Sequence, residues 1–478
     1  MSLRLTFSSA ASSAPSAPGL WLERLPALDR VTPLDAAESL LGLPGLTLLE
    51  SARPGRRSRW SYLMADPLLV LEAAPDGPDP FTEARRQLAR LAPGRLDDPS
   101  APPFTGGLAG YLGYDLGRRL ERLPSLATVD QALPELRLAL HDVVVAWDRA
   151  AGTAWLVGRA VDGDVERLRR RREELLDRLL DRPLGPAPQA ADAPPPPDPP
   201  QLFESNLDRV AFEAMVERVR DEIARGEIYQ ANVARRLSAP FRGEAWPVYR
   251  RLRTGDPVTH AAYLDLGQGR ALLSASPEPF LSVRPDGHVD TDPIKGTRPR
   301  GATPEADRVL ARELLASAKD RAENVMIVDV LRNDLGRVCV PGSVRVPRLC
   351  RLERTGAVQH LVSTVTGQLE AGRDAFDLLA ASFPGGSITG APKIRAMEVI
   401  ESLEPVRRGP YTGAALWLGA DGAMGSSILI RTLVADGERL TLHVGGGMTW
   451  RSDPTEEWDE TRAKAFGPLS ALGAIEGQ

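Results

Sequence analysis

The sequence of 478 residues contains only two cysteines, Cys339 and Cys350, and no apolar run long enough to cross a membrane. Two cysteines form neither a disulfide framework nor a cysteine-based metal cage, and a membrane-spanning helix needs about 20 consecutive apolar residues. The opening residues, MSLRLTFSSAASSAPSAPG, hold too short an apolar stretch for a secretory signal. We therefore expect a cytoplasmic globular protein that binds no membrane.

The chain also lacks an excess of positive charge. Its 59 basic and 64 acidic side chains give a net charge of −5. Binding to nucleic acid depends on clustered Lys and Arg that neutralise phosphates, so we do not expect a nucleic-acid partner. No pair among the five histidines has the spacing of zinc ligands, so zinc is not expected either.

Lysine is the scarcest charged residue. It occurs only as Lys295, Lys319, Lys393 and Lys464, so 55 of the 59 basic side chains (59 − 4) are arginine. An amine can lose its proton and act as a nucleophile or a compact charge, whereas a guanidinium cannot. Codon bias with chance survivors is the alternative, and for Lys319 the two explanations are about equal. For Lys295 and Lys464 we favour a functional role.

A proline-rich stretch divides the sequence. Residues 183–200 hold nine prolines and almost no apolar side chains, a composition typical of a stiff extended linker. We therefore expect an N-terminal region at 20–182, a linker at 183–204 and a C-terminal region at 205–470.

The apolar pattern predicts an α+β fold. Strands are expected at 47–50, 61–64, 68–72, 136–145, 154–158, 228–237, 426–435 and 439–444. Helices are expected at 164–181 and 208–226, and from Thr303-Pro304, Ser317 and Asp453-Pro454 onward. The short Asp436-Gly437 turn favours an antiparallel hairpin. We expect large, mainly antiparallel sheets with helices on the outside, and not a doubly wound parallel sheet.

Single lysines and paired carboxylates form the first candidate site. Lys295 stands between Ile294 and Gly296, where the backbone can turn and the amine can point into a cleft; a surface loop is the alternative. Two helical pairs of carboxylates, Asp320 with Glu323 and Glu457 with Glu460, are each three residues apart, and Lys464 follows one turn later. Two such helices facing each other would suit Mg²⁺, whereas solvated charged faces are the alternative.

Two glycine-rich stretches could bind an anion. Residues 384–393, PGGSITGAPK, precede a helix whose free N–H groups would face a carboxylate or phosphate, and the pattern is not a Walker loop. Gly445 to Gly447 end a strand and would let backbone approach a ligand. Either could be a simple turn, but together with Arg431 they indicate a carboxylate-binding wall. The residues alone thus predict an acidic small molecule, Mg²⁺ and a reactive amine.

These motifs strongly resemble the chorismate-utilising enzymes, the family of the anthranilate, aminodeoxychorismate, isochorismate and salicylate synthases. The resemblance spans about 205–470 through SASPEPFL, DPIKGTRPRG, AKDRAEN, HLVSTV, PGGSITGAPKIRAMEVI, SSILIRTL, GGG and ETRAK. It extends more weakly to TLLESA and PFTGGLAGYLGYDLGRRLERLP in the first region. It implies one intertwined α+β body built around two packed sheets, with the active site in the C-terminal part.

The resemblance also implies roles for individual positions. Glu323 and Glu460 would bind Mg²⁺, with Asp320 and Glu457 alongside, and the metal would hold the ring carboxylate of chorismate. Glu278 would be the general acid that protonates the departing 4-hydroxyl. The implied substrate-binding residues are Gln230, Thr297, His360, Ser387, Tyr411, Arg431, Gly445, Gly447 and Lys464.

Two positions separate the members of the family. Gln230 stands where the water-using enzymes carry a lysine base, which favours ammonia as the nucleophile. Lys295 stands where anthranilate synthases have a small residue, and in aminodeoxychorismate synthases this lysine attacks C2 of the ring before ammonia adds at C4. We therefore expect formation of 4-amino-4-deoxychorismate, on the route to 4-aminobenzoate and folate. The nearest alternative is the anthranilate synthase reaction, which aminates C2 and eliminates pyruvate.

The resemblance further implies a partner. The sequence has no glutaminase signature, so ammonia would come from a separate glutamine amidotransferase subunit. Glu50 and Ser51 in TLLESA resemble part of the tryptophan pocket of anthranilate synthases; the alternative is that this stretch is plain core. A chain that also aromatises its product is not expected, because no lyase domain follows Gln478. A non-catalytic relative is disfavoured, because Glu278, Lys295, Glu323 and Glu460 are all present.

Overall fold

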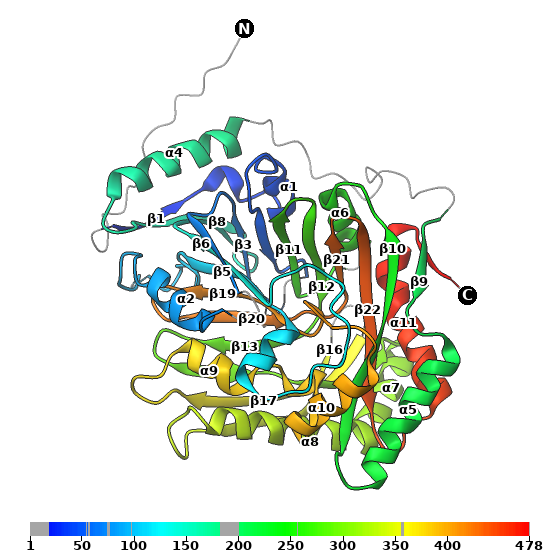
Figure 1. Ribbon diagram of the computed structural model, residues 1–478. Helices are drawn as coiled ribbons and strands as arrows, with labels where there is room; N and C mark the ends of the chain where they lie inside the picture. The colour runs from blue at the N-terminus through cyan, green and yellow to red at the C-terminus, as the bar shows by residue number, and fades with distance from the viewer. Residues whose placement is uncertain are drawn as a thin grey trace.

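The computed structural model describes residues 19–53, 55, 58–73, 77–96, 98–181, 200–255, 257–354 and 358–477. Most of the expected linker at 183–204 lies outside the described residues. In the described part, two large sheets carry helices on their outer sides (Figure 1). The expected α+β class with mainly antiparallel sheets is confirmed.

The larger sheet has 13 strands in the order β1-β8-β7-β3-β2-β11-β12-β21-β22-β10-β9-β23, with β18 paired to β10. These strands are β1 (Leu20–Arg24), β2 (Thr47–Glu50), β3 (Trp60–Met64), β7 (Val143–Asp148), β8 (Thr153–Arg159), β9 (Leu202–Ser205), β10 (Gln230–Pro240), β11 (His260–Gly267), β12 (Arg270–Ser276), β18 (Gly390–Ala391), β21 (Thr432–Asp436), β22 (Arg439–Met448) and β23 (Ile475–Glu476). The N-terminal and C-terminal regions join where β2 pairs with β11, with Leu49 opposite Ala262.

The smaller sheet has 10 strands in the order β15-β17-β14-β13-β20-β19-β5-β6-β4, with β16 paired to β17. Its strands are β4 (Leu69–Glu72), β5 (Gly107–Leu112), β6 (Leu136–His141), β13 (Pro279–Val283), β14 (His288–Thr291), β15 (Ile294–Pro299), β16 (Arg345–Arg354), β17 (Val358–Gln368), β19 (Ala414–Gly419) and β20 (Met424–Ile428). The two regions join again where β5 pairs with β19, with Gly110 opposite Leu416. Each sheet therefore consists of one block of N-terminal strands joined edge to edge to one block of C-terminal strands.

The helices lie outside the sheets, and those expected from Thr303, Ser317 and Asp453 begin at these caps. They are α1 (Pro33–Glu38), α2 (Pro80–Leu88), α3 (Gly117–Leu120), α4 (Val165–Asp181), α5 (Arg209–Ala224), α6 (Ala245–Gly255), α7 (Pro304–Ala316), α8 (Ala318–Gly336), α9 (Ala375–Ser382), α10 (Lys393–Leu403) and α11 (Pro454–Leu472). Thr303, Ser317 and Asp453 each accept a hydrogen bond from a backbone N–H at the helix start.

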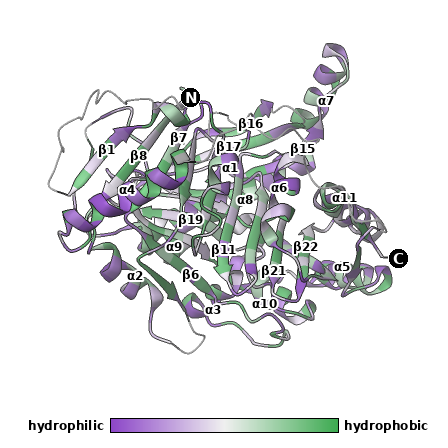
Figure 2. Cartoon of the chain, turned by 90° about the horizontal axis from the view of Figure 1, so that it is seen from above, coloured by the Kyte–Doolittle hydropathy of each residue, from purple (hydrophilic) through white to green (hydrophobic). Residues whose placement is uncertain are grey.

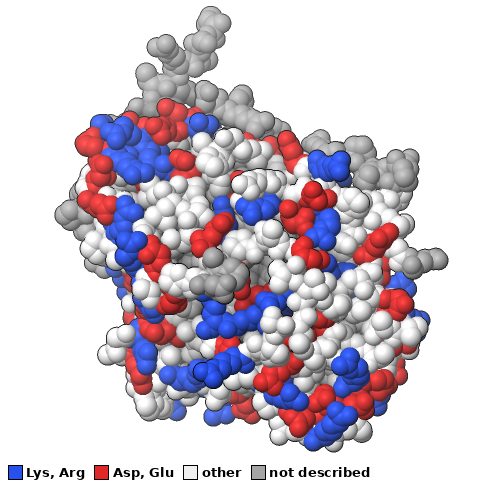
Figure 3. Space-filling view, in the orientation of Figure 1, with Lys and Arg blue, Asp and Glu red and all other residues white. Residues whose placement is uncertain are grey.

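Figure 2 shows apolar residues on the inner strands and hydrophilic residues along α4 at the edge. Acidic and basic side chains are interspersed over the face in Figure 3. Within the described ranges, no helix combines the length and apolar composition that a membrane span requires.

Two expected strands are each broken in two. The apolar run 136–145 divides at Asp142 into β6 and β7, and the run 426–435 divides before Arg431 into β20 and β21. In both cases the first strand belongs to the smaller sheet and the second to the larger one. Arg431 adopts a left-handed φ of 49° at this crossing. The runs read as continuous because buried apolar residues stand on both sides of each break, whichever sheet buries them, and the charged residue at the break is the main local sign of the change.

A third crossing, between β12 and β13, passes through Glu278, and it hydrogen-bonds to the crossing at Arg431. The amide of Ala275 donates to the carbonyl of Arg431 at 3.1 Å, and the amide of Ile428 donates to the carbonyl of Glu278 at 3.1 Å. Backbone that leaves a ladder needs other partners. The two crossings supply them to each other, which fixes the backbone at Glu278 relative to the backbone at Arg431.

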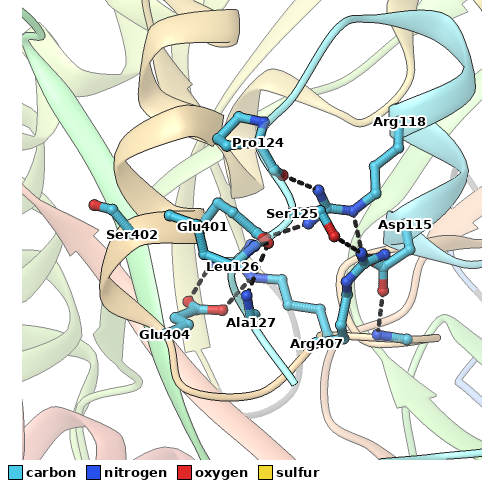
Figure 4. A network of polar contacts seen from close by, with 12 residues as sticks. Asp115, Arg118, Pro124, Ser125, Leu126, Ala127, Glu401, Ser402, Glu404 and Arg407 are labelled. Atoms are coloured by element: carbon cyan, nitrogen blue, oxygen red, sulfur yellow. Dashed lines mark hydrogen bonds and ion pairs between the residues drawn. The ribbon is translucent and has the colours of Figure 1, made fainter. Parts of the chain in front are cut away.

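A polar network ties the segment after β5 to the end of α10 (Figure 4). Glu401 accepts hydrogen bonds from Arg118 and from the amides of Leu126 and Ala127, the last two at 2.6 and 3.0 Å. Asp115 accepts from Arg118 at 3.1 Å and from the amide of Gly409 at 2.9 Å. The Glu401 side chain is only 7% exposed. The two regions of the chain are thus joined by buried charged contacts as well as by strand pairing.

Replacing Glu401 by alanine should destabilise the fold by about 3 kcal/mol, because the change removes one of the two carboxylates that pair with the buried Arg118 and leaves two amides without their acceptor. Urea unfolding followed by circular dichroism measures the effect. Glu398→Ala is the matched control on the same helix, since its partially exposed pair with Arg395 is worth less than about 1 kcal/mol. Equal losses of unfolding free energy in both variants would contradict a structural role for the network.

Candidate active site

Lys295, Ser387 and Glu278 come together from three separate segments. The Lys295 amine donates to the carbonyl oxygen of Ser387 at 3.0 Å, and the Ser387 hydroxyl donates to a Glu278 carboxylate oxygen at 2.7 Å. The pairing of β15 with β17 is irregular between Ile294 and Thr297. Such a break in register re-aims a side chain away from its regular position. The sequence placed these three residues in one site, and the structure brings them together.

Burial controls the charge of Glu278. It raises the pKa of this carboxyl group above the ordinary value, although Lys295, the Ser387 hydrogen bond and Lys464 act in the opposite direction. A carboxylic acid with a raised pKa keeps its proton toward neutral pH and can donate it. The site therefore holds an acid next to a primary amine.

The glycine-rich stretch at 384–391 is an anchored loop. Gly386 lies against Val330 of α8, where a Cβ atom would come within 2.7 Å of the valine side chain. Lys393 donates to Asp334 on α8 and to the carbonyl of Ser382, each at 2.7 Å. Lys393 thus serves to hold this loop, and so Ser387, against α8.

Glu323 and Asp320 share α8 but differ in environment. One carboxylate oxygen of Glu323 is buried and has no hydrogen-bond partner in the described residues. Burial raises the pKa of Glu323, and the nearby carboxylates Asp320 and Glu460 add to the shift, whereas Lys295 and Lys319 oppose it. Asp320 instead forms an ion pair with Arg298 at 3.0 Å. Of the two, Glu323 is the carboxylate left to bind a cation.

Helix α11 contributes Glu457, Glu460 and Lys464. Lys464 contacts Glu460 at 2.6 Å, one helical turn away, and donates to the carbonyl of Gly445 at 2.8 Å. Partial burial raises the pKa of Glu460, but the Lys464 contact outweighs it and the net pKa is lowered. Burial raises the pKa of Glu457, against a hydrogen bond from Ser452.

The described residues contain no group of three or more His, Cys, Asp or Glu side chains close enough to hold a metal by themselves. Mg²⁺ differs from zinc in this respect, because it commonly takes one or two protein carboxylates and completes its shell with water and substrate. The unpartnered oxygen of Glu323, within electrostatic reach of Glu460, fits that mode. Asp320 does not fit it, because its carboxylate is paired with Arg298.

Further expected residues line the same region. Thr297 and His360 are 2.9 Å apart through Oγ1 and Nδ1, and burial, reinforced by Arg431, lowers the pKa of His360 to about 4. Tyr411 stacks on His443 with ring centroids 4.9 Å apart and an interplanar angle of 10°. Gln230 is fully buried at the start of β10 beside Gly447. His360 and His443, whose pKa burial also lowers, are therefore neutral near pH 7.

Sequence reasoning missed Arg408 and Glu404. Both are buried, and Arg408 donates to Glu404 at 2.9 and 2.6 Å and to the carbonyl of Ile388 at 3.1 Å. It also bonds to the carbonyl of Asn232 and lies over the rings of Tyr114 and Tyr411. The only signal in the sequence is an i, i+4 pair of opposite charge, which is usually a surface feature.

Glu50 and Ser51 lie elsewhere, at a cavity of 610 Å³. Its lining includes Pro279 and Phe280, which follow Glu278 directly. Glu50 is bound by Arg253 at 2.9 and 2.5 Å, and the Ser51 hydroxyl donates to the carbonyl of Trp60 at 2.8 Å. The structure thus has a second concavity next to the strand that leaves the active site.

Comparison with known proteins agrees with the fold and the site. The model of a family described as chorismate binding enzyme matches residues 47–470. The chain is 41% identical over 464 residues to anthranilate synthase component 1 of Streptomyces coelicolor, covering 94% of this chain and 88% of that protein. It is 39% identical over 417 residues to aminodeoxychorismate synthase component 1 of Salmonella typhimurium, covering 84% and 87%. Anthranilate synthase component I from Streptococcus pneumoniae has the same fold, with a TM-score of 0.75 and 29% identity over 87% of this chain and 93% of that one. Proteins of two catalytic types thus resemble the chain to a similar degree.

Ser387→Ala should raise the pKa of Glu278 further, because the lost hydroxyl stabilised the charged carboxylate. Infrared difference spectra across a pH titration would report the carboxyl band, assigned with Glu278→Gln. Thr389→Val is the matched control, since this buried hydroxyl in the same loop bonds to the carbonyl of Gly385 instead. A band that titrates identically in Ser387→Ala and the parent protein would refute the contact.

Proposed function

Because the chain belongs to the family of chorismate-binding enzymes, we propose that it is component I of an aminodeoxychorismate synthase, which replaces the 4-hydroxyl of chorismate by an amino group. Relatives of this name and of the anthranilate synthase name both approach 40% identity, so overall similarity does not choose between them. The observation that carries the proposal is the Lys295 amine, held 3.0 Å from the carbonyl of Ser387 beside the buried acid Glu278.

In the proposed reaction Lys295 and Glu278 act together. The neutral amine of Lys295 adds to C2 of the ring, the two ring double bonds shift, and the bond from C4 to its hydroxyl breaks. Glu278 gives its proton to the departing oxygen, which leaves as water. Ammonia then adds at C4, the double bonds shift back, and Lys295 leaves C2. Covalent catalysis of this kind divides one difficult substitution into two easier ones.

Gln230 supports ammonia as the nucleophile. A neutral amide cannot remove a proton from water as a lysine amine can. In this proposal Tyr411, Arg431, Lys464 and the strand end at Gly445 and Gly447 bind the two carboxylates of chorismate, and Thr297, His360 and Ser387 border its ring. The neutral state of His360 is suited to that contact.

We propose Mg²⁺ as the cofactor, with Glu323 and Glu460 as its protein ligands and Glu457 next to them. Asp320, which is paired with Arg298, would have a supporting role. When bound, the ion would neutralise the ring carboxylate of chorismate. The chain's own part is to keep the unpartnered oxygen of Glu323 free of competing hydrogen bonds. Lys464 meanwhile holds Glu460 in position.

A separate glutamine amidotransferase subunit is proposed as the ammonia source, in line with the "component 1" in the names of the relatives.

The cavity at Glu50 and Ser51 is proposed to accommodate tryptophan, because it has both polar groups and the apolar surface of Trp60 and Phe280. Titration calorimetry with tryptophan tests this proposal. An absence of binding heat would show that tryptophan is not the ligand of the cavity.

Anthranilate synthase component I is the second candidate. It is favoured by the match to the Streptomyces coelicolor protein, which covers 94% of this chain, and it would aminate C2 and release pyruvate. Lys295 argues against it, since an amine that occupies C2 competes with ammonia for that carbon.

Product analysis separates the two. The purified chain is incubated with chorismate, Mg²⁺ and ammonium at mildly alkaline pH, with a parallel sample in which a chelator removes the metal. We expect 4-amino-4-deoxychorismate without pyruvate, and no product in the chelated sample. Anthranilate with an equal amount of pyruvate would overturn the assignment and leave Lys295 without its proposed role.

Lys295→Ala should slow product formation at least about a thousandfold, because the covalent route is lost. Binding of chorismate, followed by calorimetry, should persist. Lys319→Ala is the control, as it removes a nearby positive charge without touching the nucleophile and should keep turnover. Undiminished turnover in Lys295→Ala would exclude the adduct.

A further inference from the structure

Three side chains near the start of β10 have buried polar atoms without a hydrogen-bond partner among the described residues. These atoms are both amide atoms of Gln230, the amide oxygen of Asn232 and the hydroxyl of Thr449. Gln230 is 0% exposed and Asn232 only 8%. Buried polar groups are nearly always satisfied, so a cluster that is not indicates a missing polar occupant.

The strand register places the three side chains together. Asn232 lies opposite Gly447 and Ala231 opposite Met448, so the next pair along the strands is Gln230 and Thr449. Side chains alternate between the two faces of a sheet, and directly opposed residues share a face. Gln230, Asn232 and Thr449 therefore point to one side. The other side, with Val233 and Met448, packs in the apolar cluster that includes Trp458 of α11.

Gly447 makes room for the Gln230 side chain. A Cβ atom at Gly447 would lie 2.3 Å from the amide nitrogen of Gln230, so the Gln230 side chain leans across the strand over this glycine. Cross-strand Cβ positions are about 5 Å apart, which brings the Gln230 amide close to Asn232. The unpartnered atoms of Gln230, Asn232 and Thr449 thus border one space on this face of the sheet.

The chemistry of this space suits a small neutral molecule with several N–H or O–H donors. Its unpartnered atoms are mostly acceptors, two amide oxygens and a hydroxyl oxygen, and the three side chains carry no charge. The backbone here is fixed, because Arg408 binds the carbonyl of Asn232. The space also lies one residue from the surface, since Tyr229 is 73% and Trp450 57% exposed.

We propose that Gln230, Asn232 and Thr449 form the pocket that holds incoming ammonia before it reacts. The inference rests on the proposed function and adds Asn232 and Thr449 to it. Neutral ammonia donates to the amide oxygens of Gln230 and Asn232 and exchanges a hydrogen bond with Thr449, which leaves its lone pair for the substrate. No bond is made or broken in the pocket, which concentrates and orients the nucleophile.

The test uses two nearly isosteric variants, Asn232→Leu and Thr449→Val, which each remove polar atoms at similar volume. Initial rates are measured against ammonium and, separately, against chorismate at constant pH. Each variant should raise the KM for ammonium about three- to tenfold, the effect of one lost hydrogen bond. The KM for chorismate should stay within twofold of the parent value.

Thr441→Val is the matched control on β22, because this buried hydroxyl bonds to Gln131 and to the carbonyl of Val434, far from the pocket. It should leave both KM values unchanged. An unchanged ammonium KM in Asn232→Leu and Thr449→Val would overturn the pocket and mark it as a site for structural water. Equal rises for both substrates would overturn it too, as a general distortion. Failure of the proposed function is distinguishable, because the parent protein would then form no aminodeoxychorismate at all.

Discussion

The arrangement of the active site depends on one buried ion pair, between Arg408 and Glu404. Removing two charges from water is costly and is offset only where each is fully hydrogen-bonded. Here Arg408 reaches Glu404, the carbonyls of Asn232 and Ile388 and the hydroxyl of Thr412, while Glu404 also accepts from the amide of Ala234. β10, the glycine-rich loop and the Tyr411 segment therefore meet at a single guanidinium. Tyr114, stacked on its other side, adds the N-terminal region to the same centre.

The second constraint is the passage of the chain between two sheets. A strand that leaves its ladder exposes backbone groups that need new partners, and the paired crossings at Glu278 and Arg431 satisfy each other. These backbone hydrogen bonds fix the position of Glu278, which is partly buried, relative to Arg431, whose side chain is exposed.

The sequence allowed the fold class, most helix starts and the grouping of Lys295, Ser387 and Glu278 to be predicted. Helix caps and turn residues act locally, so Thr303, Ser317, Asp453 and Asp436-Gly437 carried reliable information. The crossings at Asp142 and Arg431 were missed, because the apolar residues on either side of them have the same hydropathy whichever sheet buries them. Arg408 was missed for a related reason: its importance comes from contacts with residues 20 to 294 positions away, such as Ile388 and Tyr114, and nothing local reveals them. The ion pair between Arg298 and Asp320 could not be predicted from the sequence either.

The protonation of Glu278 connects these constraints to the chemistry. Burial raises the pKa of Glu278, which favours the protonated form that the proposed acid needs. The same shift lowers the share of carboxylate that could pair with the amine of Lys295, and an amine attacks only in its neutral form. Glu460 shows the opposite arrangement: it lies at the exposed side, pairs with Lys464 and stays charged. The pKa values of two carboxyl groups in one site are thus shifted in opposite directions, upward by burial at Glu278 and downward by the Lys464 contact at Glu460.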